Sequence, residues 1–245
     1  MRAYLRVNGG VVRDAQAVVV AELPLTISID GQRLVTTLCS PFDVDALVVG
    51  YLWTEGVIQH ADDIAQLDVS VVDGRADVVL RWPFVPGSAR AVKPSALASS
   101  VRVRPEVVWD RIGDLAEASV HYKESRGIHS AALCDPERLL LVAEDVARRN
   151  ALDKLKGRAL LDGVATRDRI LVSSGRISSE LLLRAARMGT PIVASRTSPT
   201  DMAITLAEAL DITVCGYVRS GSLNLYTGRG VLLADTGAEA RVVPS

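Results

Sequence analysis

The chain has 245 residues, of which 49% are hydrophobic and 23% are charged, and its formal net charge at pH 7 is -1. That length suffices for one large domain or for a medium domain with a smaller one. The balanced charge argues against a nucleic-acid partner, and no stretch approaches the ~18 apolar residues of a membrane span. The three cysteines have no paired spacing and the first residues contain no apolar leader, so the sequence predicts a cytoplasmic protein with no nucleic-acid and no membrane partner.

The first part of the chain is predicted to be mostly β-structure with one helix. Two pairs of apolar, β-branched runs are each joined by an Asp-Gly dipeptide, which tolerates the positive φ angles of a hairpin turn. These pairs are residues 17–29 with 33–40, and residues 67–72 with 76–82. Residues 40–56 have the start and stop signals of a helix, with Ser40 as the predicted N-cap, Pro41 at the first helical position and Gly56 past the end.

A basic loop is predicted at residues 83–104, in the stretch from residue 83 to residue 105 that contains four prolines, no sustained periodicity and no acidic side chain. Such a composition is typical of a domain linker or of a loop beside an active site. The basic residues in or next to it are Arg81, Arg90, Lys93, Arg102 and Arg104. Two interpretations stay open, a solvated connector and a loop that meets an anion.

From residue 105 onward, helix and strand signals alternate. Helices are predicted at 105–120, 150–162, 178–188 and 199–210, and strands at 127–133, 138–143, 169–174, 191–195 and 212–218. Asn150 and Ser198 are the predicted N-caps of two helices, and Gly189 ends another. The alternation predicts an α/β layer in which helices cover the faces of a sheet.

Four polar stretches follow predicted strands, at 144–150, 173–180, 195–201 and 217–224. In open α/β sheets ligands bind at the carboxyl ends of strands, beside helix N-termini that attract anions. Glycines, serines and arginines in these stretches suit a phosphate-bearing ligand. The candidate ligand-binding residues are Glu144, Asp145, Arg149, Asn150, Ser174, Gly175, Arg176, Tyr217, Val218, Arg219, Ser220, Gly221 and Ser222. Neither a Walker loop nor a GxGxxG motif after a strand is present.

The histidines and cysteines give weaker indications of a metal or catalytic site. No two of the three histidines have metal-ligand spacing, so no metal site is predicted. His129 lies in a predicted strand, either as a packed core residue or as a ligand-binding or proton-handling group. Cys39, before a predicted helix, and Cys134, at a strand end, are the candidate nucleophiles, although each also suits the role of a small buried apolar residue.

The order of these motifs resembles the FdhD/NarQ family of formate dehydrogenase accessory proteins. The matching pieces are ELPLTISIDG, CSPFDVDALVVGYLWTEGVI, GIHSAAL, EDVARRNALDKLKG and the run from SSGRISSE to SGSLNLYT, which together span almost the whole chain. The resemblance implies an α+β or α/β fold with a smaller, mostly-β N-terminal domain, residues 1–104. It further implies a C-terminal three-layer α/β domain, residues 105–245, similar to cytidine deaminases but without their zinc site.

The resemblance also implies a function. Family members take persulfide sulfur from a cysteine desulfurase and pass it to the molybdenum or tungsten cofactor before its insertion into formate dehydrogenase. The implied client is Mo-bis(molybdopterin guanine dinucleotide), with GDP as an analogue, held near Tyr217–Ser222 in a cavity that residues 144–150, 174–176 and His129 help to line. The implied partners are the desulfurase, an apo formate dehydrogenase or related enzyme, and a second copy of the chain in a homodimer.

Two departures from the family pattern bear on this chemistry. Sulfur-carrying members have a CxxC-type motif where this chain has residues 92–106, which contain no cysteine. The family form EDVGRHNA is altered here at Ala147 and Arg149. Because a persulfide needs a thiol, two hypotheses stay open. One is sulfur transfer through another cysteine or through the partner, and the other is a non-catalytic chaperone that holds the cofactor.

Overall fold

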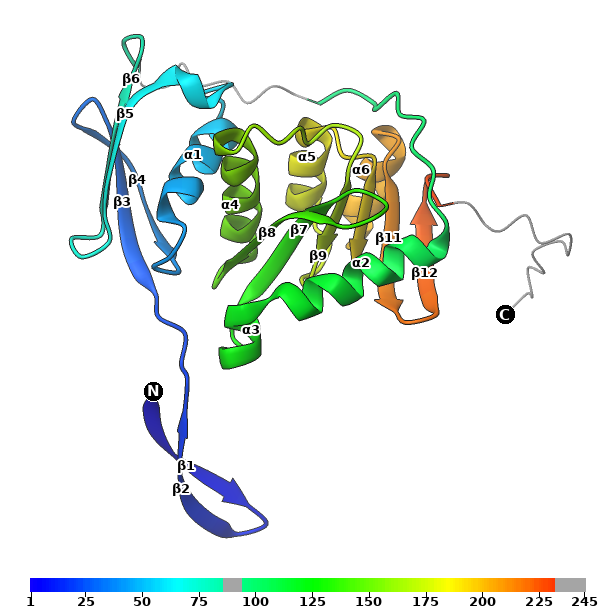
Figure 1. Ribbon diagram of the computed structural model, residues 1–245, viewed down its shortest axis with the longest axis horizontal. Coiled ribbons are helices and arrows are strands. Elements are labelled where there is room, and N and C mark those ends of the chain that lie inside the picture. The colour runs from blue at the N-terminus through cyan, green and yellow to red at the C-terminus, as the bar shows by residue number, and fades with distance from the viewer. Residues whose placement is uncertain (86–93, 232–245) are drawn as a thin grey trace, which may run out of the picture.

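The computed structural model describes residues 1–85 and 94–231. It contains a six-stranded sheet, called the larger sheet, a four-stranded sheet, called the smaller sheet, and a separate two-stranded hairpin. Figure 1 shows helices α1 and α4 between the larger and the smaller sheet. The helices are α1 Val44–Glu55, α2 Pro105–Ala118, α3 Val120–Ser125, α4 Arg148–Leu161, α5 Ser179–Met188 and α6 Asp201–Ala209, with a short 3-10 turn at Ala61–Asp63. The first strands are β1 Arg2–Asn8, β2 Val11–Ala17, β3 Leu23–Ile29, β4 Gln32–Cys39, β5 Ile64–Ser70 and β6 Arg75–Leu80. The later strands are β7 His129–Cys134, β8 Leu139–Asp145, β9 Ile170–Ser173, β10 Ile192–Ser195, β11 Thr213–Arg219 and β12 Ser222–Thr227.

The smaller sheet has the order β4-β3-β6-β5 and packs one face against α1. Along β3, Leu25, Ile27 and Ile29 alternate with more exposed neighbours and are fully buried, as expected of a strand with one face on a core. The β3–β4 and β5–β6 pairs are both antiparallel. The two hairpins predicted around the Asp-Gly dipeptides are therefore confirmed.

The larger sheet has the order β12-β11-β10-β9-β7-β8. Strands β9, β10 and β11 are parallel, and β8 runs with them because β7 is antiparallel to both β8 and β9. Helices α4, α5 and α6 cover one face and α2 covers the other, which gives three layers. The predicted α/β sheet with helices on its faces is confirmed, whereas the likeness to cytidine deaminases and the domain boundary at 104/105 stay predictions.

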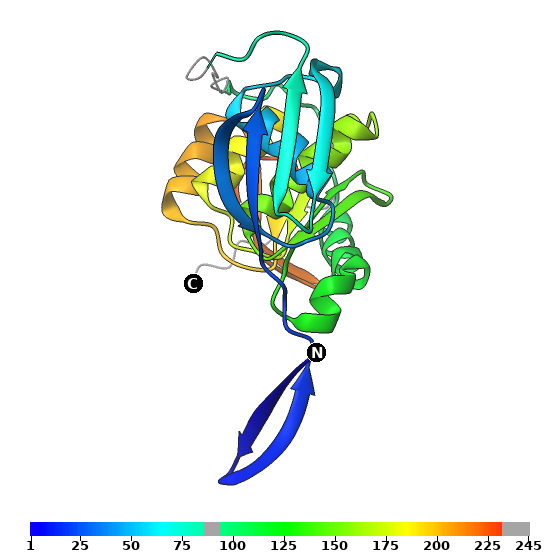
Figure 2. The ribbon, with the colours of Figure 1, turned by 90° about the vertical axis from the view of Figure 1, so that its left-hand side faces the viewer.

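Helices α1 and α4 cross in direct backbone contact between the two sheets. A β-carbon added to Gly50 would lie 1.7 Å from the carbonyl oxygen of Asp153, and one added to Gly157 would lie 1.8 Å from that of Ala46. Only glycine permits such an approach. The crossing holds the smaller sheet against the larger one, and Figure 2 looks onto the smaller sheet with these helices behind it.

Three predicted helix N-caps are wrong. Helix α1 begins after Asp43 rather than after Ser40, and α4 begins after Ala147 rather than after Asn150. Helix α6 begins after Thr200, whose hydroxyl accepts a hydrogen bond from the backbone N–H of Ala203, rather than after Ser198. Ser40 and Asn150 instead make hydrogen bonds to distant parts of the chain, and local capping rules cannot anticipate such bonds.

Predicted helix ends fare better, because they depend on backbone conformation alone. Gly56 and Gly189 both adopt the left-handed conformation just past α1 and α5. The elements that the sequence did not predict are β1, β2, α3 and β12. Strands β1 and β2 form a hairpin that projects from the body in both ribbon views (Figures 1 and 2).

The basic loop is described only in part. Arg90 and Lys93 lie outside the described residues, and a contact between this loop and an anion stays a prediction. Arg81 and Arg102 both donate to backbone carbonyls. Within residues 1–85 and 94–231, no helix is long and apolar enough to cross a membrane.

Candidate functional site

The polar stretches after β8, β9, β10 and β11 lie along one edge of the larger sheet. These four strands run in the same direction, so their carboxyl ends meet at this edge. His129 lies at the same edge because it is the first residue of β7, which runs the opposite way. The structure thus brings together the four stretches that the sequence singled out.

A cavity of about 540 Å³ opens between the loops after β8 and β9 and the first turns of α4 and α5. We call it the arginine cavity. Its lining comprises His129, Val146, Ala147, Arg148, Arg149, Leu152, Arg176, Ser178, Glu180, Leu181, Arg184 and Thr200. Three candidate residues from the sequence, His129, Arg149 and Arg176, line it. Arg148 and Arg184 were not candidates, although Arg148 stood beside one.

Two of the four arginines in the cavity are neutralised by acids. Arg184 lies 3.0 Å from a carboxylate oxygen of Asp153 and 3.0 Å from one of Glu180. Burial opposes its charge, but these two acids hold the pKa of Arg184 above its usual value. Arg149 lies 2.9 Å from Glu55 of α1 and 3.6 Å from Glu180. These pairs anchor one wall of the cavity to α1.

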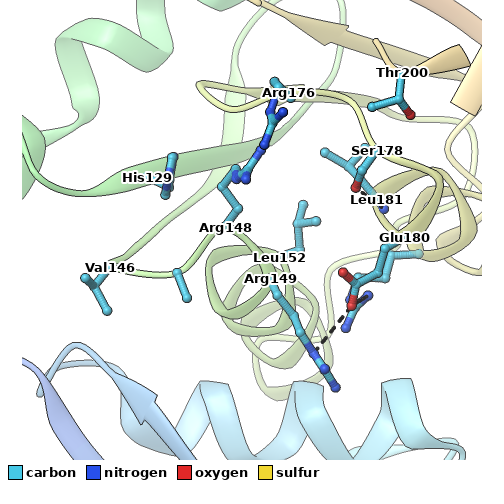
Figure 3. Close-up of a pocket in the computed structure, with 12 residues that line it drawn as sticks. His129, Val146, Arg148, Arg149, Leu152, Arg176, Ser178, Glu180, Leu181 and Thr200 are labelled. Carbon is cyan, nitrogen blue, oxygen red and sulfur yellow. Dashed lines mark hydrogen bonds and ion pairs between the residues drawn. The ribbon is translucent and has the colours of Figure 1, made fainter. Parts of the chain in front are cut away.

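The other two arginines, Arg148 and Arg176, form no ion pair with any of the described residues. In Figure 3 their side chains extend toward one another beside His129, while Arg149 and Glu180 pair on the opposite side of the cavity. Two guanidinium groups without a counter-charge repel each other, and a bound anion would remove that repulsion. Guanidinium also matches the oxygens of phosphate in bidentate geometry.

Gly175 makes room for this arrangement. A β-carbon at this position would lie 2.4 Å from Cδ of Arg148 and 3.5 Å from Nδ1 of His129. The absent side chain therefore allows the Arg148 stem to pass across the β9 loop. The candidate role of Gly175 follows from packing, since it is not itself among the lining residues.

The imidazole of His129 stays neutral down to a lower pH than that of a free histidine. Burial lowers the pKa of its imidazole, the charge of Arg148 lowers it further, and Asp145 opposes both effects. At neutral pH the ring therefore offers one donor and one acceptor nitrogen at the edge of the cavity. His129 also lines a neighbouring cavity.

This neighbouring cavity has a volume of about 500 Å³ and lies between α2, α3 and the loops after β9 and β10. The candidates Ser174 and Arg219 line it, together with Arg126, Arg196, Ser130 and Thr197. Val218, Arg219 and Ser220 line a third hollow beside α2, of about 550 Å³. Tyr217, Gly221 and Ser222 line none of the three. Tyr217 is exposed on β11, and Gly221 and Ser222 lie at the exposed turn that leads into β12.

The candidates Glu144, Asp145 and Asn150 serve the fold rather than the cavity walls. Asp145 is fully buried and forms an ion pair of 2.7 Å with the fully buried Lys154. It also accepts hydrogen bonds from the backbone N–H of Ser40 and from the Asn150 amide, at 3.0 Å each. Because Ser40 belongs to the β4–α1 loop, this network joins the smaller sheet to the start of α4.

Glu144 meets the first turn of α3. Its carboxylate oxygens accept hydrogen bonds from the backbone N–H groups of His121 and Tyr122, at 3.0 and 2.9 Å, and from the Ser130 hydroxyl at 3.2 Å. A carboxylate in this position satisfies backbone donors that a helix start leaves unpaired. Glu144 thereby fixes α3 beside the neighbouring cavity.

All three thiols are buried and protonated. Cys39, Cys134 and Cys215 are fully buried, and burial raises the pKa of Cys39 to about 11 and those of Cys134 and Cys215 to about 12. A thiolate is the nucleophilic form, so neither candidate is placed to accept sulfur in this conformation. Among the described residues, no group of three or more His, Cys, Asp and Glu side chains could hold a metal ion.

The fold and its sheet edge define an α/β protein with an arginine-lined cavity at the carboxyl ends of parallel strands. The chain belongs to the FdhD/NarQ family, whose model matches residues 20–86 and 83–232. It is 38% identical over 248 residues to the sulfur carrier protein FdhD of Bacillus subtilis, covering 93% of this chain and 95% of that protein. It is 37% identical over 234 residues to the sulfur carrier protein FdhD of Halalkalibacterium halodurans, covering 85% of this chain and 86% of that protein.

A solved structure is also similar. The crystal structure of a candidate formate dehydrogenase accessory protein from Desulfotalea psychrophila aligns with a TM-score of 0.82 at 26% identity. The alignment covers 95% of this chain and 98% of that one. The resemblance expected from the sequence motifs is therefore confirmed.

Proposed function

We propose that this protein is a cytoplasmic accessory factor for formate dehydrogenase maturation that binds molybdopterin guanine dinucleotide at the carboxyl edge of its larger sheet. The observation that carries the proposal is the Arg148–Arg176 pair, two cations without a carboxylate partner among the described residues, in a cavity of about 540 Å³. The names of the relatives and of the similar structure support the accessory role.

The donors along the sheet edge fit such a ligand. Its pyrophosphate needs cations and hydrogen-bond donors, which Arg148, Arg176 and the Ser178 hydroxyl provide in the arginine cavity. The neighbouring cavity, which shares His129, adds Arg196 and Arg219. The cofactor is cargo here, and the protein's part is to bind it, orient it and pass it on.

A sulfur-transfer step is suggested by the relatives' name, sulfur carrier protein. In that version a cysteine desulfurase supplies persulfide sulfur for the bound cofactor. The second candidate function is a chaperone that holds the cofactor without transferring sulfur. The burial of all three thiols favours this second candidate, because a persulfide carrier needs an accessible thiolate.

A thermal-shift measurement with GDP tests the ligand site. We expect GDP to raise the melting temperature of the wild type by mass action, and Arg176→Ala and Arg148→Ala each to remove most of that rise. Arg158→Ala is the matched control, because Arg158 is exposed on α4 and its one ion pair with a described residue is with Asp162. The absence of a shift in the wild type at millimolar GDP would contradict the proposal.

Intact-mass analysis separates the two candidate functions. The protein is incubated with a cysteine desulfurase and cysteine, and its mass is measured before and after reduction. A reducible gain of one sulfur that disappears in Cys39→Ser or Cys134→Ser would support transfer through that thiol. We expect no gain in the native protein, which supports the holding function.

A further inference from the structure

Lys156 of α4 is a nearly buried lysine without a counter-charge. The chain has four lysines, of which Lys93 lies outside the described residues. Lys123 and Lys154 each form an ion pair of 2.7 Å with an acid. Lys156 is 9% exposed and forms neither an ion pair nor a hydrogen bond with any described residue. Because a lysine is seldom buried without a partner, this amine is a candidate for a chemical role.

The Lys156 amine shares an aromatic ring with a second cation. Its Nζ lies 4.4 Å from the centre of the Trp53 indole ring, and Cζ of Arg187 lies 4.5 Å from the same centre. The Arg187 guanidinium is held there by hydrogen bonds to the backbone carbonyls of Trp53 and Thr54. The three helices that carry this cluster, α1, α4 and α5, stand side by side in Figure 1. Their packing therefore fixes a positive charge close to the amine.

The acids of the same three helices pair with other cations. Glu55 of α1 pairs with Arg149, while Asp153 of α4 and Glu180 of α5 both pair with Arg184. None of these three acids forms an ion pair with the lysine. The cluster of two cations and one indole therefore keeps its positive charges unneutralised.

The environment of the Lys156 amine makes it a nucleophile. Burial lowers the pKa of this amine and the charge of Arg187 lowers it further, to about 8. At pH 8 about half of the amine is therefore neutral, whereas an ordinary lysine is neutral to less than about 1%. A neutral, desolvated lysine amine attacks electrophilic carbon, which the protonated form cannot do.

A cavity of about 510 Å³ reaches this cluster from solvent. Trp53 and Arg187 line it near the C-terminal ends of α1 and α5, together with Gly56 and Gly189. None of the described residues that line it is acidic. Because the Lys156 side chain is almost covered, a reactant that reaches it from this side must be small.

We propose that Lys156 captures carbon dioxide as a lysine carbamate. The lone pair of the neutral amine forms a bond to the carbon of carbon dioxide, and the electron pair of one C=O π bond moves onto its oxygen. The nitrogen then releases a proton to water, so the side chain ends with one negative charge. Arg187 thereby faces an anion instead of a cation, and the repulsion across the shared ring becomes an attraction.

Carbon dioxide fits this cluster better than an acyl donor does. An acyl group would leave a neutral amide on Lys156, and Arg187 would gain no anion. An acyl donor is also larger than the nearly covered amine admits. The carbamate site lies apart from the arginine cavity, and its test does not depend on nucleotide binding.

Chemical trapping on the full-length protein tests the site. The protein is equilibrated at pH 8 with carbon-13-labelled carbon dioxide and treated with triethyloxonium ion, which converts a carbamate into a stable ethyl ester. Peptide mapping by mass spectrometry then locates the labelled ester. We expect it at Lys156 and not at Lys123 or Lys154, whose ammonium groups are held in ion pairs.

Three variants show whether the cluster causes the reaction. Lys156→Arg keeps the positive charge and should lose the labelled ester at this position. Arg187→Gln keeps the amine but removes the charge that favours both its neutral form and its carbamate. The yield should then fall by about threefold or more, since half a pKa unit is a factor of about three. Arg167→Gln is the matched control, because Arg167 lines the same cavity but has a largely exposed side chain, and it should leave the yield unchanged.

The wild type alone can overturn the proposal. Absence of the labelled ester from Lys156 would do so, and so would equal yields at Lys156 and Lys123, which would show that the reagent reports amines in general. An unchanged yield in a folded Arg187→Gln protein would equally contradict the role of the cluster. Should that variant fail to fold, the ratio of the Lys156 yield to the Lys123 yield in the wild type decides.

Discussion

At the scale of single residues, the carboxyl edge of the larger sheet separates side chains that bind from side chains that support. Arg148 and Arg176 face the cavity without acids, whereas Asp145 and Lys154 are buried beneath it in an ion pair. The sequence placed Asp145, Arg148 and Arg176 at one sheet edge, in the polar stretches that contain them, but it could not tell their roles apart. Glu144, Asp145 and Asn150 looked like ligands because polar residues after a strand usually reach solvent. Here the end of β4 and the β4–α1 loop bind Asp145 and Asn150, and the start of α3 binds Glu144.

The Gly175→Ala substitution tests how the cavity is built. The added methyl would lie 2.4 Å from Cδ of Arg148, which is a flexible side chain, so we expect the protein to fold and the Arg148 guanidinium to move. The melting-temperature rise with GDP should then fall by at least half. Gly113→Ala is the control, because a methyl group there would have nothing within 4 Å, and it should leave the rise unchanged.

The buried pair Asp145–Lys154 should dominate the stability of the junction between the sheets. Asp145→Ala leaves the Lys154 ammonium buried without its partner, which costs about 3–5 kcal/mol of unfolding free energy. Adding Lys154→Met to that variant should recover part of the loss, although the hydrogen bond from the Ser40 N–H stays lost. Urea denaturation of both variants measures this, and a double variant less stable than Asp145→Ala would contradict the account.

His129 should make stability depend on pH in a definite direction. Its pKa is lower in the folded protein than in the unfolded chain. At a pH between these two values, His129 is mostly protonated in the unfolded chain and mostly neutral in the folded protein. The free energy of unfolding contributed by His129 therefore decreases as the pH falls through that window, and the contribution is zero above it. Urea denaturation between pH 5 and 8 gives the free energy of unfolding of the wild type and of His129→Gln. The stability advantage of the wild type over the variant should become smaller, or change sign, as the pH falls.

At the scale of elements, the sequence predicted turns and helix ends correctly, because these depend on local backbone conformation. It misplaced helix starts that depend on hydrogen bonds to other elements. Asp30–Gly31, Gly56 and Gly189 specify turns and helix ends through φ alone, and all adopt the positive φ angles expected. The starts of α1 and α4 were misplaced because Ser40 and Asn150 are used in bonds to other elements. The N-terminal hairpin was missed since it has no buried face to impose an alternating pattern.

The α1–α4 crossing gives a prediction at this scale. Gly50→Ala places a methyl against the backbone carbonyl of Asp153, which cannot move aside as a side chain can. We expect the free energy of unfolding to fall by about 1–3 kcal/mol. Gly113→Ala, in the interior of α2 with open space around it, should instead stabilise by about 0.5–1 kcal/mol. Equal effects of the two substitutions would show that the crossing is looser than described.

At the scale of the whole molecule, one junction connects the smaller sheet to the candidate site. Arg149 of the arginine cavity pairs with Glu55 of α1, and Asp153 beneath it accepts from Thr54 of the same helix. The position of the cavity wall therefore depends on how α1 packs on α4. The sequence could predict the four polar stretches at one sheet edge, but not this connection, because it joins residues about 100 positions apart.

The central claim is that the arginine cavity holds a nucleotide-bearing cofactor, and the most direct measurement is mass spectrometry of what the protein binds. The protein is purified without oxygen from cells that make molybdopterin guanine dinucleotide, and the released small molecules are quantified. We predict molybdopterin guanine dinucleotide from the wild type and from Arg158→Ala, and its loss from the Arg148→Ala, Arg176→Ala double variant. Equal amounts released from the wild type and the double variant, or none from the wild type together with no GDP binding, would contradict the claim.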